Sequence, residues 1–384
     1  MEKGYKILGN YIRLVDERNK NLAVTKLLGV SISKKFIPSI ANIVGTDLSN
    51  YKIVRTGQFA YGPVTSRNGE KISIAYLDEE DCIISSSYTV FEVENKEELD
   101  PEYLMLWFSR PEFDRYARYK SHGSVREIFD WNELCMVELP VPDIEKQRKI
   151  VKAYKTITDR IDLKQKINDN LVSTLQSIYK KMFLESQNTY MTTPLADLCS
   201  KIGSGATPKG GKAAYFDKGI SLIRSMNVFD YFFSYPELAH ISQIQANALA
   251  NVEIQQADVL FNITGVSVTR CCVVPDDVLP ARVNQHVMII RPYKGKNMSY
   301  YIMCTLCTSE NKAKLLGIGQ SGSTREAINK QELESFEIPV PSDEELESFG
   351  KIATKIYAFI FSNTNEIRML CDMKDTLLTK LSSY

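Results

Sequence analysis

The sequence lacks the features that would direct it to a membrane or to an export pathway. Its first ten residues, MEKGYKILGN, contain no apolar run of the kind that a signal peptide needs. No apolar stretch approaches the ~18 residues that cross a bilayer, and IYAFIF (356–361) is too short. We therefore expect a cytoplasmic protein whose eight cysteines are reduced thiols.

Histidine is scarce, which argues against a metal centre. The chain has three, at His122, His240 and His286. Cys304 and Cys307 have CxxC spacing, but a zinc site needs a second such pair or two histidines nearby. The stretch YYIMCTLCTSENKAKLL around them reads as a helix with both thiols among apolar neighbours. We expect structural cysteines there, because cysteine is so often buried.

The chain also lacks an excess of charge of either sign. It has 47 basic and 47 acidic residues, so its formal charge is zero. A protein that binds nucleic acid by bulk charge is basic, so any such role here needs local basic patches or a more basic partner. The 384 residues, 44% hydrophobic and 24% charged, suit an ordinary soluble protein with two full domains.

Motifs for catalysis are missing as well. The stretch GSGATPKGGKAA (203–214) departs from a phosphate-binding loop, because five residues separate Gly205 from Gly211 and Ala213 stands where the metal-binding hydroxyl belongs. No G-x-G-x-x-G follows a strand, no H-E-x-x-H or G-x-S-x-G occurs, and no Asn/Asp-Pro-Pro-Tyr is present. The sequence therefore favours recognition over catalysis.

What the chain does contain is a long internal repeat. GSVREIFDWNELCMVELPVP (123–142) and GSTREAINKQELESFEIPVP (322–341) align without a gap, 199 positions apart, and ten of their twenty positions are identical. A weaker match joins YLMLWFSRPE (103–112) to YIMCTLCTSE (301–310) at an offset of 198, and both segments look like helices. Because this period is the length of a domain with its connector, the chain looks duplicated.

A long helix is predicted after each Pro-Val-Pro, which can neither continue a helix nor sit in a central strand. Apolar residues recur there at spacings of three and four, as in a heptad seam, with Lys164 and Asn363 as polar members at equivalent places. Glu145 and Glu344 fall in the first turns, where carboxylates complement the helix dipole. The two seams are Ile150, Tyr154, Ile157, Ile161, Lys164, Asn168, Leu171, Leu175, Ile178 and Met182, and Phe349, Ala353, Ile356, Ile360, Asn363, Ile367, Leu370, Lys374, Leu377 and Leu381.

The seams leave two interpretations. Two amphipathic helices could each pack on their own domain, but seams this long favour a partner helix, and the repeat supplies one. A polar residue in such a seam sets register rather than adding stability.

Strands and turns are predicted upstream of the repeat. QFAYGPVTSRNGEKISIAYL (58–77) and the run ending DCIISSSYTVFEVE (81–94) look like hairpins. In the second half ISLIRSMNVFDYFF, DVLFNITGVSVTRCCVVP and ARVNQHVMIIRP look like strands. Outside the repeated blocks the two halves diverge, which suits two related tasks on different targets.

Taken in order, these blocks resemble the specificity subunit of type I restriction–modification systems. The resemblance is carried by two globular units, each closed by a Gly-Ser turn and E-[LI]-P-V-P before a long helix, and by PDIEKQRKIV at 142–151. GQFAYGPVTSRNG in the first unit fits as well, as do KIGSGATPKGG, ISLIRSMNV, DVLFNITG and ARVNQHVMIIRP in the second. Each block alone is weak, but their order and duplication are specific and cover nearly the whole chain.

The resemblance implies an α+β fold, with two α/β target-recognition domains joined by two long helices that form an antiparallel coiled coil. The expected segments are a first domain at 1–143, spacer helix 144–185, a second domain at 186–342 and spacer helix 343–384. The second helix begins SDEELESFGKI and lacks the Gln-Arg-Lys of the first, which puts equal partner affinity at the two ends in doubt.

The family's role is to bind a bipartite target in double-stranded DNA without catalysing a reaction itself. The resemblance implies as partners two copies of an adenine-N6 methyltransferase subunit and a restriction/translocase subunit. S-adenosylmethionine, ATP and Mg belong on those partners, and none of them on this chain.

Candidate DNA contacts lie in polar loops, where Arg, Lys, Asn and Gln can reach base edges or phosphates. Arg126 and Arg325 occur in both copies of the repeat, which argues for a phosphate contact or a salt bridge with a neighbouring Glu rather than base reading. Asn284, Gln285 and His286 either read bases or cap the following strand, and we favour the cap. The candidates are Tyr61, Ser66, Arg67, Lys71, Ser124 and Arg126 in the first unit, and Lys209, Lys212, Arg224, Asn262, Thr264, Arg270, Ser323, Thr324 and Arg325 in the second.

Three other functions stay open on the sequence. The chain could serve a related system whose methylase and nuclease are one fused partner. It could be a duplicated coiled-coil scaffold that binds protein and not DNA. It could also be an enzyme with an unrecognised site, because scattered carboxylates do not exclude a nuclease.

Overall fold

The computed structural model describes residues 4–39, 45–66, 68–123, 127–208, 210–320 and 327–383. The chain divides into two compact units. Unit 1 comprises residues 1–163 and 367–384, and unit 2 comprises residues 164–366. Each unit therefore contains part of each predicted long helix, and each is described separately below.

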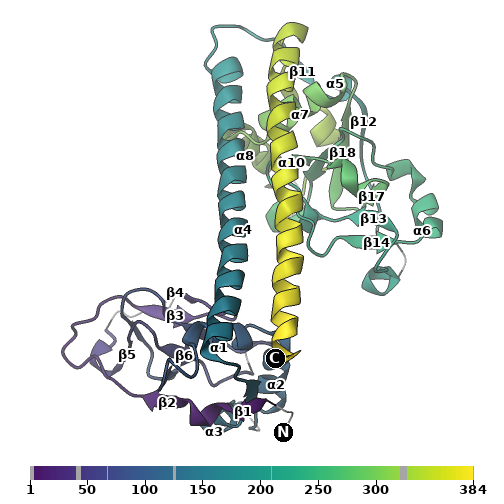
Figure 1. Ribbon diagram of the computed structural model, residues 1–384. Helices are drawn as coiled ribbons and strands as arrows, with labels where there is room; N and C mark the ends of the chain where they lie inside the picture. Colours follow the sequence, from purple (N-terminus) through teal and green to yellow (C-terminus); the bar gives the residue numbers. More distant parts are fainter. Residues whose placement is uncertain are drawn as a thin grey trace. The chain divides into compact units, whose positions relative to one another are not determined.

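The two long helices occupy the segments in which heptads were predicted (Figure 1). Helix α4 spans Ile144–Tyr179 and continues into a π-helical turn at Lys180–Leu184, and α10 spans Asp343–Lys380. Every residue of the two predicted seams is buried or half-buried, while most of the residues between them are exposed. The predicted periodicity is therefore confirmed.

Within each unit the two helices pack against each other in antiparallel directions. In unit 2 the middle of α4 meets the middle of α10, where Lys164 Nζ donates to Asn363 Oδ1 at 2.9 Å. Farther along α4, the ring centroid of Tyr179 lies 6.0 Å from that of Phe349, near the start of α10. In unit 1 the start of α4 and the end of α10 share one buried cluster. The helices thus bury their seams against each other as well as against the globular parts.

The globular part of unit 1 is built on a four-stranded antiparallel sheet. Its elements are β1 (Tyr5–Ile7), β2 (Ile12–Val15), β3 (Leu28–Val30), β4 (Phe36–Pro38), β5 (Lys52–Val54), β6 (Phe59–Tyr61), β7 (Ile74–Tyr76), β8 (Cys82–Ile84), β9 (Thr89–Val93), α1 (Pro101–Phe108), α2 (Pro111–Tyr119), α3 (Trp131–Cys135) and β10 (Glu138–Pro140). The sheet order is β2-β9-β6-β7. Successive side chains of a strand point to opposite faces, so Phe59 and Phe91 pack with α1 while Ala60 and Val90 pack on a second layer formed by β3, β5 and β8.

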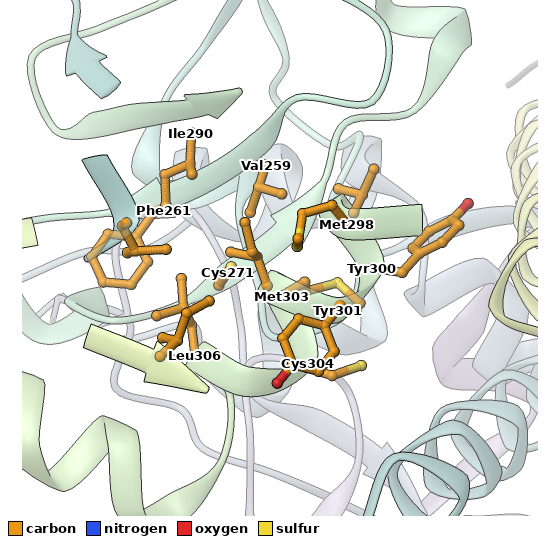
Figure 2. Packing of buried hydrophobic residues seen from close by; sticks show 14 of the residues in the cluster. Val259, Phe261, Cys271, Ile290, Met298, Tyr300, Tyr301, Met303, Cys304 and Leu306 are labelled. Atoms are coloured by element: carbon orange, nitrogen blue, oxygen red, sulfur yellow. The ribbon is translucent and has the colours of Figure 1, made fainter. Parts of the chain in front are cut away.

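Unit 2 repeats this arrangement. Its elements are β11 (Thr192–Pro194), α5 (Leu195–Leu198), β12 (Cys199–Ser204), β13 (Ile220–Ile223), β14 (Ala239–Ile241), α6 (Gln243–Ala248), β15 (Val259–Asn262), β16 (Cys271–Val273), β17 (Ala281–Val283), β18 (Val287–Pro292), α7 (Gly295–Leu306), α8 (Ser309–Gln320), α9 (Lys330–Glu334) and β19 (Glu337–Pro339). The main sheet has the order β12-β18-β15-β16, and a second sheet has the order β14-β13-β17. Figure 2 shows Val259, Phe261 and Ile290 of the main sheet packed with Met303 and Leu306 of α7.

The main sheets of the two units therefore correspond strand by strand. In both, the first strand pairs with the last, and the last pairs with the first strand of a hairpin. The hairpins are β6–β7 in unit 1 and β15–β16 in unit 2. The sequence comparison missed this duplication, because the strands keep their burial but not their residues. The predicted α+β fold of two sheet-based domains with two long helices is confirmed.

One of the two predicted hairpins in unit 1 is correct. Residues 58–77 form the β6–β7 hairpin, in which Phe59 pairs with Tyr76. The prediction for 81–94 is wrong, because β8 pairs with β5 and β9 pairs with β2 and β6. The turn between them, in which Tyr88 N donates to Ser85 O at 3.1 Å, carries the chain from the second layer to the main sheet.

The repeated segment performs the same structural task in both units. Strand β10 pairs with β1, and β19 pairs with β11, so each Pro-Val-Pro closes its unit against the unit's own first strand. The Tyr103 hydroxyl donates to Pro140 O at 3.0 Å, and the Tyr301 hydroxyl donates to Pro339 O at 2.7 Å. These two tyrosines are the ones that the weaker repeat aligned. The weaker sequence match therefore reflects a hydrogen bond that both units share, from a tyrosine of α1 or α7 to the proline of the repeated segment.

The CxxC pair lies where the sequence predicted. Cys304 is fully buried in α7, and Cys307 follows at the helix end, half-buried. Burial raises the pKa of the Cys304 thiol well above its usual value, as expected for a structural cysteine. Among the residues that the structure describes, no three His, Cys, Asp or Glu side chains are grouped so as to hold a metal ion.

Candidate nucleic-acid interface

The hairpin of the main sheet carries predicted contact residues in both units. Ser66 and Lys71 lie in the loop of the β6–β7 hairpin, and both are exposed. Thr264 and Arg270 lie in the loop of the β15–β16 hairpin, and both are half-exposed. These four candidates were chosen only for their residue type and their polar surroundings. They nevertheless lie on equivalent hairpin loops of the two units.

The repeated segment is joined to this hairpin in the same way in each unit. Phe129 N donates to Pro63 O at 2.8 Å in unit 1, and Ile328 N donates to Ile263 O at 2.9 Å in unit 2. Each donor lies two positions after the repeated Gly-Ser-x-Arg-Glu, and each acceptor lies near the start of the hairpin loop. The described chain that follows each Gly-Ser-x-Arg-Glu segment therefore adjoins the hairpin of its unit, although the segments themselves lie largely outside the described residues.

In unit 2 the base of the hairpin loop is fixed by the turn before β18. Thr264 Oγ1 is 2.7 Å from His286 Nδ1. Asn284 is buried, and its Oδ1 accepts from His286 N at 3.0 Å, which caps the start of β18 as favoured from the sequence. The favoured role of Asn284 is therefore confirmed, while Gln285 beside it is exposed.

The glycine-rich loop of unit 2 reaches the same turn. Gly205 N donates to Asn284 O at 3.1 Å, and a Cβ at Gly205 would lie 1.7 Å from Val283 O, so no other residue fits there. Thr207 Oγ1 donates to Gln285 Oε1. The glycine-rich segment 203–214, whose sequence departs from a phosphate-binding loop, thus packs at Gly205 and Thr207 against the turn before β18. Thr207 escaped the sequence analysis, since only its contact with Gln285 singles it out.

Arg270 differs from the other described arginines of unit 2. Its guanidinium lies 4.6 Å from the ring centroid of Phe229, and no acceptor for its N–H groups is found among the residues that the structure describes. Arg291 and Arg282, in contrast, are paired with Asp258 and Glu253 respectively. Stacking holds the Arg270 fork in place, while its donors remain available to an outside acceptor.

Comparison with known proteins agrees with this fold. A family model described as "Type I restriction modification DNA specificity domain" matches residues 32–172 and 187–369. The chain belongs to this family. The two matched stretches cover most of the two globular parts together with much of α4 and α10.

Curated members of the specificity family are similar to parts of the chain. The HindI specificity subunit of Haemophilus influenzae is 24% identical over 160 residues, which are 41% of this chain and 34% of that protein. The MjaIX specificity subunit of Methanocaldococcus jannaschii is 20% identical over 300 residues, 73% of this chain and 68% of that protein. The chain thus matches about a third of the first relative and about two thirds of the second.

A solved structure supports the fold. The crystal structure of the type I restriction-modification S subunit from M. genitalium matches with a TM-score of 0.58 at 14% identity, covering 98% of this chain and 95% of that one. At this identity the likeness concerns the fold alone.

Three described candidates of the specificity-family chain are buried or bonded within the fold. Tyr61 is fully buried in β6, and burial raises the pKa of its hydroxyl. Asn262 is fully buried at the end of β15, where its Nδ2 donates to Ser225 O at 2.9 Å. Arg224 stacks 5.5 Å from the Tyr215 ring centroid and donates to Glu237 O. These side chains hold the fold, so we leave them out of the proposed interface.

The remaining candidates fall where the structure gives no side chain. Seven of them lie outside the described residues, namely Arg67, Ser124, Arg126, Lys209, Ser323, Thr324 and Arg325. The side chain of Lys212 is also not described. Their roles stay predictions, including the choice between phosphate contact and salt bridge for Arg126 and Arg325.

Cations in the hairpin loops differ from two exposed arginines of unit 1 in their pairing with carboxylates. In unit 1 exposed arginines are neutralised by carboxylates, as Arg13 is by Glu92 and Arg55 is by Asp81 at 2.7 Å. Lys71 has no carboxylate partner among the described residues. Local positive charge on a neutral chain is therefore available at the hairpin loops. Within the described part of the chain, no helix is both long and apolar enough to span a membrane.

Proposed function

We propose that this chain is the specificity subunit of a type I restriction–modification system. Each unit reads one half of a bipartite target in double-stranded DNA, with the β6–β7 hairpin in unit 1 and the β15–β16 hairpin in unit 2. The observation that carries this proposal is the equivalent placement of both hairpins on a duplicated framework, with Arg270 presented without an acceptor among the described residues.

The physics of DNA recognition supports this role. A two-stranded ribbon fits the major groove, and an arginine fork bonds the O6 and N7 atoms of guanine in a bidentate manner. A neutral chain gains little from bulk attraction to phosphates, so its specificity rests on local contacts and on the charge of its partners.

The chemistry belongs to partner subunits in this proposal. Two copies of an adenine-N6 methyltransferase and a restriction/translocase subunit assemble with this non-catalytic chain, and they bring S-adenosylmethionine, ATP and Mg. The helices α4 and α10 act as the spacer that fixes the gap between half-sites. The complex works on DNA in the cytoplasm.

An exchange of most of the globular part of unit 2 tests whether each unit reads its own half-site. Residues 190–321 are replaced by those of another family member, and the methylated adenines are mapped in cells that also carry the methyltransferase partners. One half of the modified motif changes and the other half stays. A change in both halves, or in neither, would contradict the proposal. The purified chain alone should neither methylate nor cleave DNA.

Arg270 allows a sharper test of the reading hairpin. Arg270→Ala in the complex lowers affinity for the cognate duplex by about 1–3 kcal/mol. Arg270→Lys keeps the charge but loses the planar fork, so it restores affinity only if the contact is to phosphate. Lys314→Ala is the matched control, because Lys314 is an exposed cation of unit 2 paired with Glu310. Equal binding by the Arg270→Ala and Lys314→Ala variants would remove Arg270 from the interface.

The spacer is tested by its length. Inserting seven residues into both α4 and α10 keeps the heptad seam in phase and adds about 10 Å. At 3.4 Å per base pair the tolerated gap grows by about three. A modified motif with an unchanged gap would show that the helices do not set the spacing.

A further inference from the structure

Val266 stands out on the β15–β16 hairpin, because its side chain is 100% exposed. It is the middle residue of a 3-10 turn, Gly265–Ser267, at the tip of the loop. Gly265 before it has φ +71, a left-handed conformation that favours glycine. Scattered apolar residues are common on protein surfaces, so exposure alone does not assign a role.

The tip that carries Val266 is held in a fixed shape. Val268 N donates to Gly265 O at 2.9 Å, and Thr269 N donates to Asn262 O at 2.9 Å. Val268 and Thr269 are both buried, so the chain on one side of the tip is anchored in the core. A branched side chain presented on such a turn has little conformational freedom left to lose when a partner covers it.

The position of Val266 within the hairpin points to what covers it. Thr264, two residues before, adjoins the repeated segment through its bridge to Ala327. Arg270, four residues after, is the arginine whose donors find no acceptor in the described chain. An apolar group between polar contact residues suits a base edge that presents both polar atoms and a methyl group. In the major groove only thymine offers such a methyl group, and apolar side chains are what contact it.

We propose that Val266 packs on the C5-methyl group of a thymine in the half-site that unit 2 reads, and so selects that base. The inference rests on the proposed function. It adds a residue that recognises a base through apolar contact and not through a hydrogen bond. It predicts that the half-site assigned to unit 2 by the exchange of residues 190–321 contains a thymine at a position sensitive to this residue.

The test uses the intact chain in complex with its methyltransferase subunits and duplexes in which each thymine of that half-site is replaced in turn by deoxyuridine. Uracil pairs as thymine does but lacks the methyl group. One such replacement weakens binding of the unaltered complex by about three- to fourfold, the equivalent of one buried methyl group. Val266→Ala weakens binding to the thymine duplex by a similar factor and binds both duplexes equally.

Ile244→Ala is the matched control, since Ile244 is another exposed branched residue of unit 2, 82% exposed on α6. That variant keeps the discrimination between thymine and uracil. The proposal is overturned if no thymine in the half-site responds to deoxyuridine, or if Val266→Ala still discriminates. Specific binding by the unaltered complex establishes the proposed function in either case, so loss of that binding would be a separate failure.

Discussion

Unit 1 and unit 2 share a framework and differ in what they attach to it. Both order their main sheet in the same way, and both bond a tyrosine of the covering helix to the repeated proline segment. The second layer differs, because unit 2 has a three-stranded sheet where unit 1 has two separate strand pairs. The two units therefore share the order of the main sheet and the tyrosine bonds to the repeated segment, while the surrounding layers differ.

The starts of the long helices show the same contrast at a single position. Gln147 in α4 is fully buried, and its amide bonds Asp100 N, Glu98 O and Pro142 O at 2.8–2.9 Å. The equivalent residue of α10 is Leu346, also buried, in an apolar cluster. Gln147 of the Gln-Arg-Lys motif thus faces inward, so its absence from the second helix reflects a different packing solution.

A cavity beside each long helix has likewise kept its place and changed its chemistry. In unit 1 it is lined by Lys155 and Asp159 of α4, among other charged residues. In unit 2 the equivalent cavity is lined by Thr354 and Ala358 of α10, with several aromatic rings. The two cavities lie beside equivalent helix positions, since Lys155 and Asp159 are the repeat counterparts of Thr354 and Ala358. Their lining residues differ in charge and in aromatic content.

The largest expected difference between the units concerns one pair of equivalent seam residues. Phe349→Ala removes a fully buried ring that packs on Tyr179 and Phe183, at a cost of about 3–5 kcal/mol in free energy of unfolding. Ile150→Ala, at the equivalent position in unit 1, costs nearer the lower end of about 2–5 kcal/mol. Hydrogen exchange of peptides from each unit separates the two effects. Equal costs would mean that unit 2 does not depend on the aromatic cluster.

A smaller effect is expected at the helix starts. Gln147→Leu copies the residue of α10 but leaves Asp100 N, Glu98 O and Pro142 O without their partner, at a cost of about 1–3 kcal/mol. Leu346→Gln buries an amide among apolar side chains, and we expect a similar loss. Urea unfolding of both variants measures the free energies. If Gln147→Leu were neutral, the amide bonds would not be what secures α4.

The smallest effect should be the same in both units. Tyr103→Phe and Tyr301→Phe each remove one hydrogen bond to the repeated proline segment and keep the ring, at a cost of about 1 kcal/mol each. Thermal unfolding combined with hydrogen exchange of β10 and β19 reads each loss locally. A large effect in one unit and none in the other would break the equivalence that the repeat suggests.

The long helices were predictable because their signal is dense and periodic. Each seam contains about ten residues spaced by three and four. An apolar face that continues over this length predicts an α-helix and no other regular structure. The duplicated sheet was not predictable in this way, since strands of three to six residues carry little pattern. The pairing of β8 and β9 was wrong because a turn between adjacent strands can lead to another layer as readily as back along the same sheet.

The candidate site was predictable in part, for a related reason. Arg270 was chosen by residue type and lies on the hairpin with its donors available among the described residues. Tyr61 and Asn262 were chosen on the same ground but sit in strands buried on both faces. Burial of a polar residue inside a short apolar strand depends on the second layer, and the sequence of the strand does not reveal that layer. Val266 carries no polar group, so a search for base-reading chemistry passes over it.

The contact between Lys164 and Asn363 has a consequence for how halves of this chain can associate. Each is the repeat counterpart of the other, 199 positions apart, and their side chains meet within unit 2. Two copies of α4 pairing with each other in that register would bring two ammonium groups face to face, at an electrostatic cost that the Lys–Asn pair avoids. Having an ammonium in one repeat and an amide in the other thus disfavours the pairing of α4 with a second α4 and favours its pairing with α10 of the same polypeptide.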